Sequence, residues 1–302
     1  MPIVARIWGG LGNQMFAYAF ARALALRNDD ELLLDTRSGF HKDPYRRTYC
    51  LDHYRINYPE ATGFDCRPDQ LGSLARRLKK VTNKNRNIES ATYIEEPKNP
   101  QFMPEIASLD TRSRRVLFRG YWQSPRYFDD FSDEIRSDFT VTAPLDEHTR
   151  KTQDAMANCD AIGLHARRLH MVPAGEEKSG PKKGVNQIPL EYYKTAVEKM
   201  ASGLSNPHLF CFGDAKDWLR ENLDFDLPMT IVEGREGDEW AYQDIHLISQ
   251  CQRFAIANSS FSWWGAWLSN SPNKQIYYPL PSSWSWFWNR DIIPSDWSAI
   301  KC

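Results

Sequence analysis

A histidine and two adjacent arginines follow an apolar run in the middle of the chain, in the stretch HARRLH at residues 165–170. The run before them, from Asp160 to Leu164, is typical of a buried strand. Ligands of open α/β sheets lie outside the carboxyl ends of the strands, and arginine presents a rigid fork of donors that suits phosphate oxygens. His165, Arg167 and Arg168 are therefore predicted to clamp a diphosphate, with an interdomain salt bridge as the alternative.

A second cluster of polar residues follows another apolar run near the C-terminus. Asn258, Ser259, Ser260 and Phe261 stand where a strand would end and a helix would begin. A serine at this position caps the helix, and the free N–H groups of the first turn, together with the helix dipole, attract an anion. Because most serine caps are only caps, this prediction depends on the arginines. The two clusters are expected to form two sides of one pocket.

Three glycines, Gly9, Gly10 and Gly12, follow the first apolar run in the sequence GGLGNQ. They resemble a dinucleotide-binding loop, but their spacing is not G-x-G-x-x-G. Glycines still allow a tight turn here and the close approach of a ligand to the backbone. We therefore include this loop among the candidate ligand contacts.

Two aspartates are further candidates. Asp214 follows the apolar run 208–212, where it either caps a helix or contacts a ligand. Asp244 lies on a partly apolar face of the helix-like stretch 239–251. A carboxylate in that position is either paired with an arginine or bound to a ligand donor such as guanine or ribose.

The elements that must position these residues follow from the apolar pattern. Short branched or aromatic runs predict strands at Ile3–Trp8, Glu31–Asp35, Val116–Trp122, Ala161–His165, His208–Phe212, Thr230–Val232, Phe254–Ala257 and Ile276–Tyr278. Longer stretches predict helices that begin at Asn13 and at Ser124–Pro125 and that span Leu190–Met200, Ala215–Asn222, Glu239–Cys251 and Phe261–Leu268. Alternating strands and helices indicate parallel sheets covered on both faces.

This alternation begins twice along the chain, which predicts two Rossmann-type α/β domains that face each other across a cleft. We expect an N-terminal domain of residues 1–145 and a C-terminal domain of residues 146–302 with a tryptophan-rich tail. The linker is predicted within residues 140–149. Residues 68–81 are expected to form a basic helix, and residues 82–87 a polar loop.

Composition excludes several classes of protein. A net charge of -1 over 302 residues lacks the basic excess of a nucleic-acid-binding protein. Six cysteines without a CxxC spacing are typical of reduced thiols in an intracellular protein, not of a disulfide framework or a zinc site. The N-terminus has no signal-peptide core, and no stretch approaches the ~20 apolar residues of a transmembrane helix. The many aromatic residues suit sugar binding or a large core, and we assign the WWxxW stretch at 263–267 to the core.

Three motifs together are more specific than any one of them. GGLGNQMF near the N-terminus, HxRR in the middle and IANSSFSWWGAWL near the end resemble, in this order and spacing, the alpha-1,2-fucosyltransferase family (glycosyltransferase family 11). FCFGDAKDW and DIHLISQC resemble two weaker landmarks of that family. The resemblance implies a GT-B architecture, GDP-fucose as donor, inversion at the anomeric carbon, and no required metal or other cofactor. It also implies that the second domain binds the nucleotide and the first shapes the acceptor side.

The resemblance implies roles for individual residues as well. His165 and Arg167 would contact the nucleotide and its β-phosphate, and Asn13 would face the reacting sugar. The diphosphate pocket would be lined by Ser259, Ser260 and Phe261.

The sequence departs from the family after HxRR, where the family has Gly-Asp and this chain has Leu169-His170. This departure leaves the catalytic base open, with His170 and Asp214 as candidates. The loop that follows is rich in glycine and proline, and it carries Lys178, Lys182 and Lys183. These lysines would favour acidic acceptors, and a solvated loop without a partner is the alternative.

The leading hypothesis is an enzyme that transfers fucose from GDP-fucose to the 2-hydroxyl of a galactoside. The acceptor would be a galactose-terminated oligosaccharide or a lipid-linked glycan of the bacterial surface, such as the O-antigen of lipopolysaccharide. The alternatives are a transferase of another sugar nucleotide or linkage, and a catalytically silent nucleotide-sugar-binding protein. We expect a cytoplasmic protein without a nucleic-acid partner, with room for peripheral contact at the inner membrane.

Overall fold

The computed structural model describes residues 2–62, 92–98, 100–112, 115–170, 182–183, 187–280 and 290–302. The expected basic helix, the polar loop after it and Lys178 lie outside these ranges. So do residues 281–289, where the tryptophan-rich tail begins. For residues 169–170 and 182–183 the description covers the backbone.

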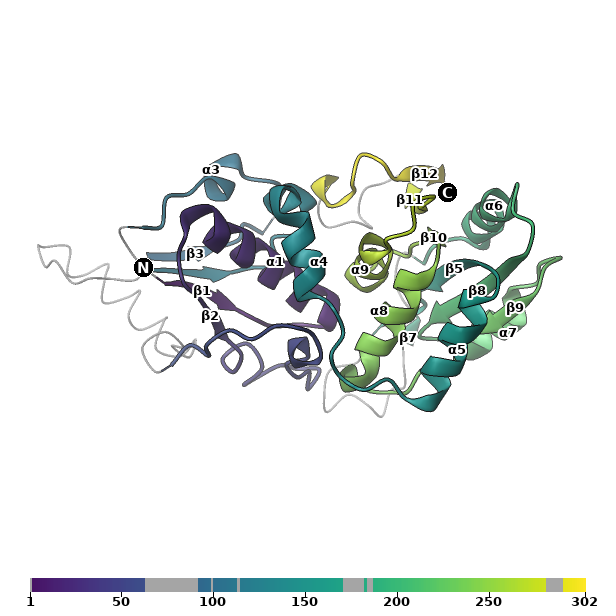
Figure 1. The fold of residues 1–302 in the computed structure, drawn as a ribbon, viewed down its shortest axis with the longest axis horizontal. Coiled ribbons are helices and arrows are strands. Elements are labelled where there is room, and N and C mark those ends of the chain that lie inside the picture. Colours follow the sequence, from purple (N-terminus) through teal and green to yellow (C-terminus); the bar gives the residue numbers. More distant parts are fainter. Residues whose placement is uncertain are drawn as a thin grey trace, which may run out of the picture.

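Two α/β units lie side by side along the long axis of the molecule (Figure 1). The first contains a parallel sheet of β1 (Ile3–Arg6), β2 (Leu32–Asp35), β3 (Thr92–Glu95) and β4 (Val116–Arg119). The second contains a parallel sheet of β5 (Asp160–Ala166), β8 (Pro207–Gly213), β9 (Met229–Ile231), β10 (Arg253–Ala255), β11 (Gln275–Leu280) and β12 (Ser298–Lys301). A short antiparallel pair joins β6 (Leu169–His170) to β7 (Lys182–Lys183).

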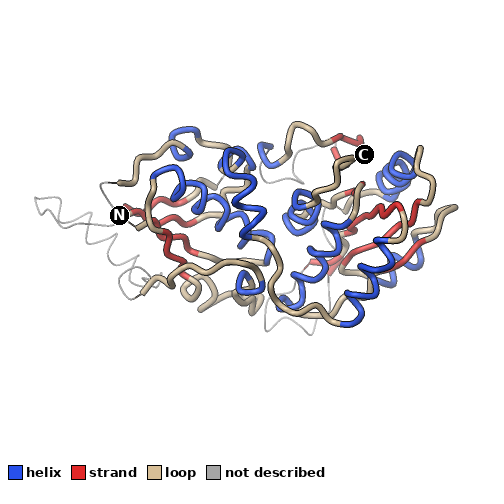
Figure 2. The backbone as a smooth tube through the Cα atoms, in the orientation of Figure 1, coloured by secondary structure: helices blue, strands red, loops and turns tan. Residues whose placement is uncertain are grey.

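Helices enclose the strands of both sheets (Figure 2). They are α1 (Leu11–Asn28), α3 (Pro104–Ala107), α4 (Ser132–Asp138), α5 (Glu147–Ala157), α6 (Leu190–Ala201), α7 (Lys216–Asn222), α8 (Ala241–Gln250) and α9 (Ser260–Leu268). Short 3-10 turns are η1 (Leu51–His53), η2 (Pro125–Tyr127), η3 (Asp129–Phe131), η5 (Asp238–Trp240) and η7 (Arg290–Ile292). The α/β class predicted from the sequence is confirmed.

The strand order defines where ligands bind. The second sheet has the order β12-β11-β10-β5-β8-β9, the Rossmann order, in which successive strands are added first on one side of β5 and then on the other. Its switch point lies between β5 and β10. The first sheet has the order β2-β1-β4-β3, with a switch point between β1 and β4. Crevices outside the carboxyl ends of these strand pairs are the expected ligand sites.

Helix α1 joins the two units. It contacts β1 and β2 on one side and α9 on the other. Phe16 of α1 packs against Trp263 and Trp264 of α9, with ring centroids 4.6 and 4.9 Å apart. Helix α1 is buried on most sides, so its apolar residues are spread around the helix instead of forming one stripe. Both tryptophans and Trp267 are buried, so the assignment of the WWxxW stretch to the core is confirmed.

The second sheet is buried on both faces, as parallel sheets are. Ile162 and Leu164 of β5 pack in a core with Tyr192 and Tyr193 of α6. Ala161 of the same strand belongs to the other core, which also includes the buried faces of α8 and α9. The apolar run of β5 is therefore continuous in the sequence because neighbouring side chains enter different cores.

Several elements differ from the sequence prediction, which also lacked strands β3, β6 and β7 and helices α3 and α4. Helix α5 begins at Glu147, inside the predicted linker, because the Asp146 carboxylate caps it by accepting from the Thr149 N–H at 2.8 Å. A 3-10 turn takes the place of the helix expected at Ser124–Pro125, since the Ser124 hydroxyl donates to the Asp291 carbonyl and caps nothing. The edge strand β12 was not predicted, because only one of its four residues is buried.

Candidate functional site

The two units touch where α1 and α9 begin. A Cβ atom at Gly12 would lie 2.5 Å from the carbonyl carbon of Ser260 and 2.6 Å from the backbone nitrogen of Phe261. The backbones of the two helix ends therefore meet without a side chain between them, which requires glycine. This contact brings the switch point of the first sheet to the switch point of the second.

Asn13 lies at the centre of this contact. Its Oδ1 accepts hydrogen bonds from Ser260 Oγ at 2.7 Å and from Gln123 Nε2 at 2.9 Å. The side chain of Tyr121 is hydrogen-bonded to it as well. Tyr121 and Gln123 follow β4, so Asn13 links the carboxyl end of the first sheet to the start of α9. The sequence prediction singled out Asn13 and Ser260 but missed these two partners, because nothing in their local sequence indicates that they reach α1.

The turn that carries Tyr121 is strained. Trp122 has a positive φ of 54° although it is a bulky, buried residue. The Glu96 carboxylate holds the turn by accepting from the Tyr121 N–H at 2.7 Å and the Trp122 N–H at 2.9 Å. Burial raises the pKa of Glu96. The turn is thus held by the Glu96 carboxylate, although burial disfavours the ionised form of this group.

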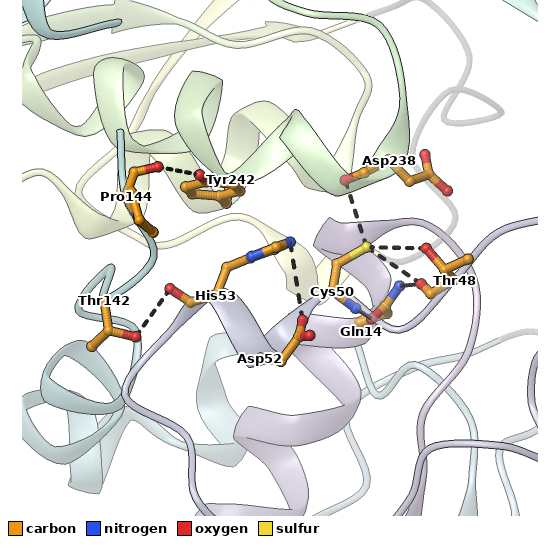
Figure 3. A network of polar contacts seen from close by, with 9 residues as sticks. All are labelled: Gln14, Thr48, Cys50, Asp52, His53, Thr142, Pro144, Asp238 and Tyr242. Atoms are coloured by element: carbon orange, nitrogen blue, oxygen red, sulfur yellow. Dashed lines mark hydrogen bonds and ion pairs between the residues drawn. The ribbon is translucent and has the colours of Figure 1, made fainter. Parts of the chain in front are cut away.

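The glycine loop after β1 is held by a buried amide. Gln14 donates from Nε2 to the carbonyls of Gly9 and Thr48, and its Oε1 accepts from the Cys50 N–H at 3.0 Å (Figure 3). Gly9 has a φ of 78°, and a Cβ there would stand 2.8 Å from the Tyr121 hydroxyl oxygen. Gly9 and Gly12 are therefore required by the backbone and by close packing.

A seam between the units includes Cys50, His53, Asp238 and Tyr242 (Figure 3). Cys50 Sγ lies 3.5 Å from the carbonyl oxygen of Asp238, and the rings of His53 and Tyr242 stack at 4.3 Å. The Tyr242 hydroxyl donates to the Pro144 carbonyl at 2.6 Å. The first unit thus contacts η5 and α8 of the second.

His165, the residue before the last in β5, has a buried, neutral ring. Only 5% of the residue is exposed. Burial, followed by the charges of Arg167 and Lys216, lowers the pKa of His165 to about 3. Its ring lies 5.6 Å from that of Phe261, so the end of β5 lies close to the start of α9. Its buried Nδ1 has no hydrogen-bond partner within the described ranges.

The two arginines of HARR diverge. Arg167 is 40% exposed, and its Nε lies 3.1 Å from Asp214 Oδ2. Arg168 instead lies over the Trp218 ring at 3.9 Å and donates to the Ile188 carbonyl at 2.8 Å. Neighbouring side chains leave an extended backbone on opposite sides. Arg167 is therefore the guanidinium available to a ligand near His165.

Asp214 joins the two arginines. In addition to its contact with Arg167, its Oδ1 accepts from the Arg168 N–H at 2.8 Å. Both oxygens of the carboxylate are thus engaged. This arrangement fixes the direction of Arg167.

Asp244 and Lys216 are oppositely charged residues of the second unit that interact electrostatically. Burial raises the pKa of Asp244 to about 6, against the opposing charge of Lys216. Lys216 begins α7 and donates to the Val232 carbonyl. Its charge acts on both Asp244 and His165. The sequence prediction missed Lys216, although its position two residues after Asp214 at a strand end was a usable signal.

The start of α9 carries the remaining predicted residues. Ser259 is the N-cap and accepts from the Phe261 N–H at 3.3 Å, as predicted for a capping serine. Ser260 points instead to Asn13, and Asn258 is half-buried just after β10. His170 lies in β6, and its side chain is outside the description.

Asp238 is a carboxyl group between the units that the sequence prediction missed. Burial raises its pKa, and Arg47 of the first unit and Arg167 of the second both oppose that rise. Asp238 therefore lies within electrostatic reach of both sides of the seam. Its surroundings in the sequence, EGREGDEW, are typical of an exposed loop and gave no signal.

The described part of the chain has neither a metal-ligand cluster nor a membrane-spanning helix. No group of three His, Cys, Asp or Glu side chains there is arranged to hold a metal ion. Among the described helices, none has the length and apolar character needed to cross a bilayer.

Two Rossmann-type units whose switch points face each other define the GT-B architecture of nucleotide-sugar-dependent glycosyltransferases. The family model described as "Glycosyl transferase family 11" matches residues 104–300. The chain therefore belongs to glycosyl transferase family 11 and is a glycosyltransferase, so the resemblance found in the sequence is confirmed.

Several known proteins are similar to this chain. An alpha-1,2-colitosyltransferase of Escherichia coli is 27% identical over 99% of both chains. The O-antigen biosynthesis glycosyltransferase WbnK of Escherichia coli is 29% identical over 90% of this chain and 91% of its own. Galactoside alpha-(1,2)-fucosyltransferase 2 of Mus musculus is 23% identical over 56% of this chain and 49% of its own. A mutant of Arabidopsis thaliana FUT1, solved in complex with GDP, shares the fold with a TM-score of 0.53 at 14% identity, covering 95% of this chain and 71% of that chain.

Proposed function

We propose that this protein transfers L-fucose, or a closely related deoxy sugar, from a GDP-sugar to the 2-hydroxyl of a galactoside during synthesis of a bacterial surface glycan. Family membership supports the reaction class. The names of the colitosyl and fucosyl relatives support the 1,2 linkage, and the O-antigen relative supports the pathway. The acceptor would be a galactose-terminated oligosaccharide or lipid-linked glycan.

One observation carries the proposal. Arg167 and the first turn of α9 stand at the carboxyl ends of the two strands that flank the switch point of the second sheet. Asn13 meets the same turn from the first unit. A diphosphate between Arg167 and the N–H groups of α9 would place its sugar toward Asn13.

The donor nucleotide would extend from there into the second unit. Asp244 has a buried carboxylate without a hydrogen-bond partner in the described residues, so it is suited to accept from the N–H donors of a guanine base. His165 is neutral, so one ring nitrogen donates and the other accepts. Arg168 does not contact the phosphates in this proposal. Its backbone N–H positions Asp214, and Asp214 in turn positions Arg167.

Charge development explains why Arg167 matters. As the bond between the sugar and the β-phosphate breaks, negative charge grows on the departing GDP and positive charge on the sugar ring. Arg167 and the N–H groups at the start of α9 stabilise the departing diphosphate without a metal ion. The acceptor hydroxyl attacks from the opposite face of the sugar, which inverts the anomeric carbon.

The acceptor hydroxyl must lose a proton as it attacks. Asp214 has both oxygens engaged by arginines, which leaves it as a positioning residue. Asp238 lies within electrostatic reach of both units, and burial raises its pKa, which makes its carboxylate a stronger base than an exposed one. We therefore assign the proton to Asp238: the acceptor oxygen bonds to the anomeric carbon, GDP leaves, and Asp238 becomes protonated.

A nucleotide panel tests the donor. Thermal unfolding is measured with GDP, UDP, ADP and CMP, each with and without EDTA. GDP at about 100 times its Kd should stabilise the protein by about 2.7 kcal/mol, with EDTA making no difference. Equal stabilisation by UDP would contradict the choice of base, and loss of the GDP effect with EDTA would contradict metal-independent binding.

Turnover separates the remaining alternatives. Colitose lacks one hydroxyl of fucose, and the relative that matches this chain over its full length is a colitosyltransferase. GDP release is therefore measured with GDP-fucose and GDP-colitose in the presence of galactosides, and the linkage of the product is determined by NMR. Binding of GDP without release from either donor would identify a silent binding protein.

A further inference from the structure

A pocket of about 700 Å³ opens in the first unit, away from the predicted nucleotide site. It lies at the carboxyl ends of β1, β2 and β4, with Arg6 and Trp8 from the end of β1 and Arg119 and Tyr121 from the end of β4. This is the switch point of the first sheet, where an α/β sheet binds its ligand. The volume lies within the range of small-molecule sites, about 300–1,000 Å³.

The pocket concentrates positive charge. Its lining includes the basic side chains Arg6, Arg37, Lys42, Arg47 and Arg119. Its acidic lining consists of Asp43 and Glu60. Two of the cations are paired, Arg37 with Glu60 at 2.7 Å and Arg119 with Glu95 at 3.5 Å. The chain as a whole has a net charge of -1. A local excess of cations in a near-neutral protein indicates an anionic ligand.

One wall of the pocket is aromatic. Trp8 and Tyr121 stack with ring centroids 4.4 Å apart and an angle of 19° between the rings. The guanidinium of Arg119 lies 5.8 Å from the Trp8 ring. The buried Nε1–H of Trp8 has no acceptor within the described ranges, and a buried donor of this kind is usually satisfied. Apolar faces beside such a donor suit the ring and the oxygens of a sugar.

The pocket is connected to the site of transfer. Tyr121 lines the pocket and is hydrogen-bonded to Asn13, and Asn13 accepts from Ser260 of α9. Arg47, which also lines the pocket, acts on Asp238. A saccharide held in the pocket would therefore extend toward the groups that we place around the reacting sugar.

We propose that this pocket binds the acceptor glycan through a negatively charged sugar unit, which bears a carboxylate or a phosphate. The inference rests on the proposed transferase function. A neutral galactoside can be bound by hydrogen bonds and an aromatic face, and its binding does not require several cationic side chains. Guanidinium forks match carboxylate and phosphate oxygens.

The first test compares acceptors. The full-length enzyme is assayed with a galactoside whose neighbouring sugar is a uronic acid, with the same compound reduced to the neutral alcohol, and with a phosphate monoester in the same position. The measured quantity is the ratio of kcat/KM for each charged acceptor to that for the neutral one. We expect a ratio of roughly tenfold or more, since a hydrogen bond to a charged group contributes about 1.5–3 kcal/mol. The phosphate and carboxylate arms show which anion is preferred, and a ratio near one for both would overturn the proposal.

Variants then assign the preference to the pocket. Lys42→Gln and Arg119→Gln should each reduce the charged-to-neutral ratio several-fold. The matched control is Arg112→Gln, because Arg112 lies in the first unit but outside the pocket and pairs with Asp110 at 3.0 Å. Equal ratios in the wild type and both pocket variants would place the charge recognition elsewhere.

A binding measurement keeps this inference separate from the catalytic one. Calorimetry with the uronic-acid disaccharide and no donor reports the pocket directly, and Trp8→Phe or Arg119→Gln should weaken the binding. If the variants weaken binding but the wild-type protein shows no turnover, the result contradicts the proposed function and leaves the pocket assignment intact. Turnover of neutral and charged acceptors at equal efficiency, without charge-dependent binding, would contradict the pocket alone.

Discussion

The contact between α1 and α9 can be tested by adding a single carbon. In Gly12→Ala, the new Cβ would stand 2.5 Å from the Ser260 carbonyl carbon and 2.6 Å from the Phe261 nitrogen, whereas ordinary contacts begin near 3.4 Å. Both obstructing atoms are backbone, so no side chain can rotate away. The difference between 3.4 and 2.5 Å means that the helix ends must separate by about 0.9 Å.

A separation of this size acts on the geometry of transfer. Asn13 lies on α1 and its partner Ser260 on α9, and their 2.7 Å hydrogen bond spans the contact. A displacement of about 1 Å between catalytic groups can cost roughly 10²-fold in rate, so kcat should fall by about that factor. Overpacking should lower the free energy of unfolding by about 1–3 kcal/mol. The Kd of GDP should change little, because its proposed ligands lie mainly in the second unit.

The control is a glycine whose replacement destabilises the protein elsewhere. Gly203 has a φ of 75° and no atom within 4 Å of an added Cβ. Gly203→Ala should therefore cost about 1–2 kcal/mol through backbone strain alone and leave kcat unchanged. Steady-state kinetics and chemical denaturation are measured for both variants. A kcat for Gly12→Ala within threefold of the wild type, or an equal loss in Gly203→Ala, would refute the reasoning.

Three further predictions concern charged and titratable residues of the second unit. Arg167→Gln should lower kcat/KM by roughly 10²–10³ without changing the midpoint of thermal unfolding. Arg168→Gln should mainly lower that midpoint. Initial rates and thermal unfolding are measured for both variants, and the opposite pattern would contradict the assignment. Asp244→Asn should raise the free energy of unfolding at pH 7–8 and leave it unchanged below about pH 4, because a pKa raised to about 6 makes the ionised carboxylate unfavourable in the folded state. Denaturation across pH measures this, and equal stability at pH 8 contradicts it. His165 has a folded pKa of about 3, below its unfolded value, so its neutral form contributes stability above about pH 6.5 that is lost as the pH falls toward 3. His165→Asn should flatten that part of the curve by up to about 1.4 kcal/mol per pH unit, and parallel curves would count against it.

The sequence predicted the elements well because their signals are local. The apolar run before His165 forms β5, and the polar cluster from Asn258 follows β10. These two strands flank the switch point of the second sheet. The directions of side chains were harder to predict. Arg167 and Arg168 were treated as one clamp, although neighbouring residues of an extended segment point to opposite sides, and Arg168 lies against Trp218.

Contacts between residues far apart in the sequence could not be predicted from local patterns. Gln123 and Asn13 are 110 residues apart, and Ser260 and Asn13 are 247 apart. Asp238 lies in a stretch that is polar and rich in glycine, typical of a solvated loop. Its position against the first unit depends on how the two sheets face each other, and no property of its neighbours in the chain encodes that.

Several residues that break local rules lie near this interface. Trp122 has a left-handed backbone, and His165 and Trp8 bury ring nitrogens without partners in the described part of the chain. Asp244 keeps a carboxylate where burial raises its pKa to about 6. Each feature costs free energy in the folded protein, and a stabilising core would select against all of them. These four residues lie near the carboxyl ends of β1, β4 and β5 and on α8. Ligands would offset these costs if they accept hydrogen bonds from the His165 and Trp8 rings, donate to Asp244 and fill the pocket beside Tyr121. Saturating concentrations of donor and acceptor together should therefore stabilise the protein more than either ligand does alone.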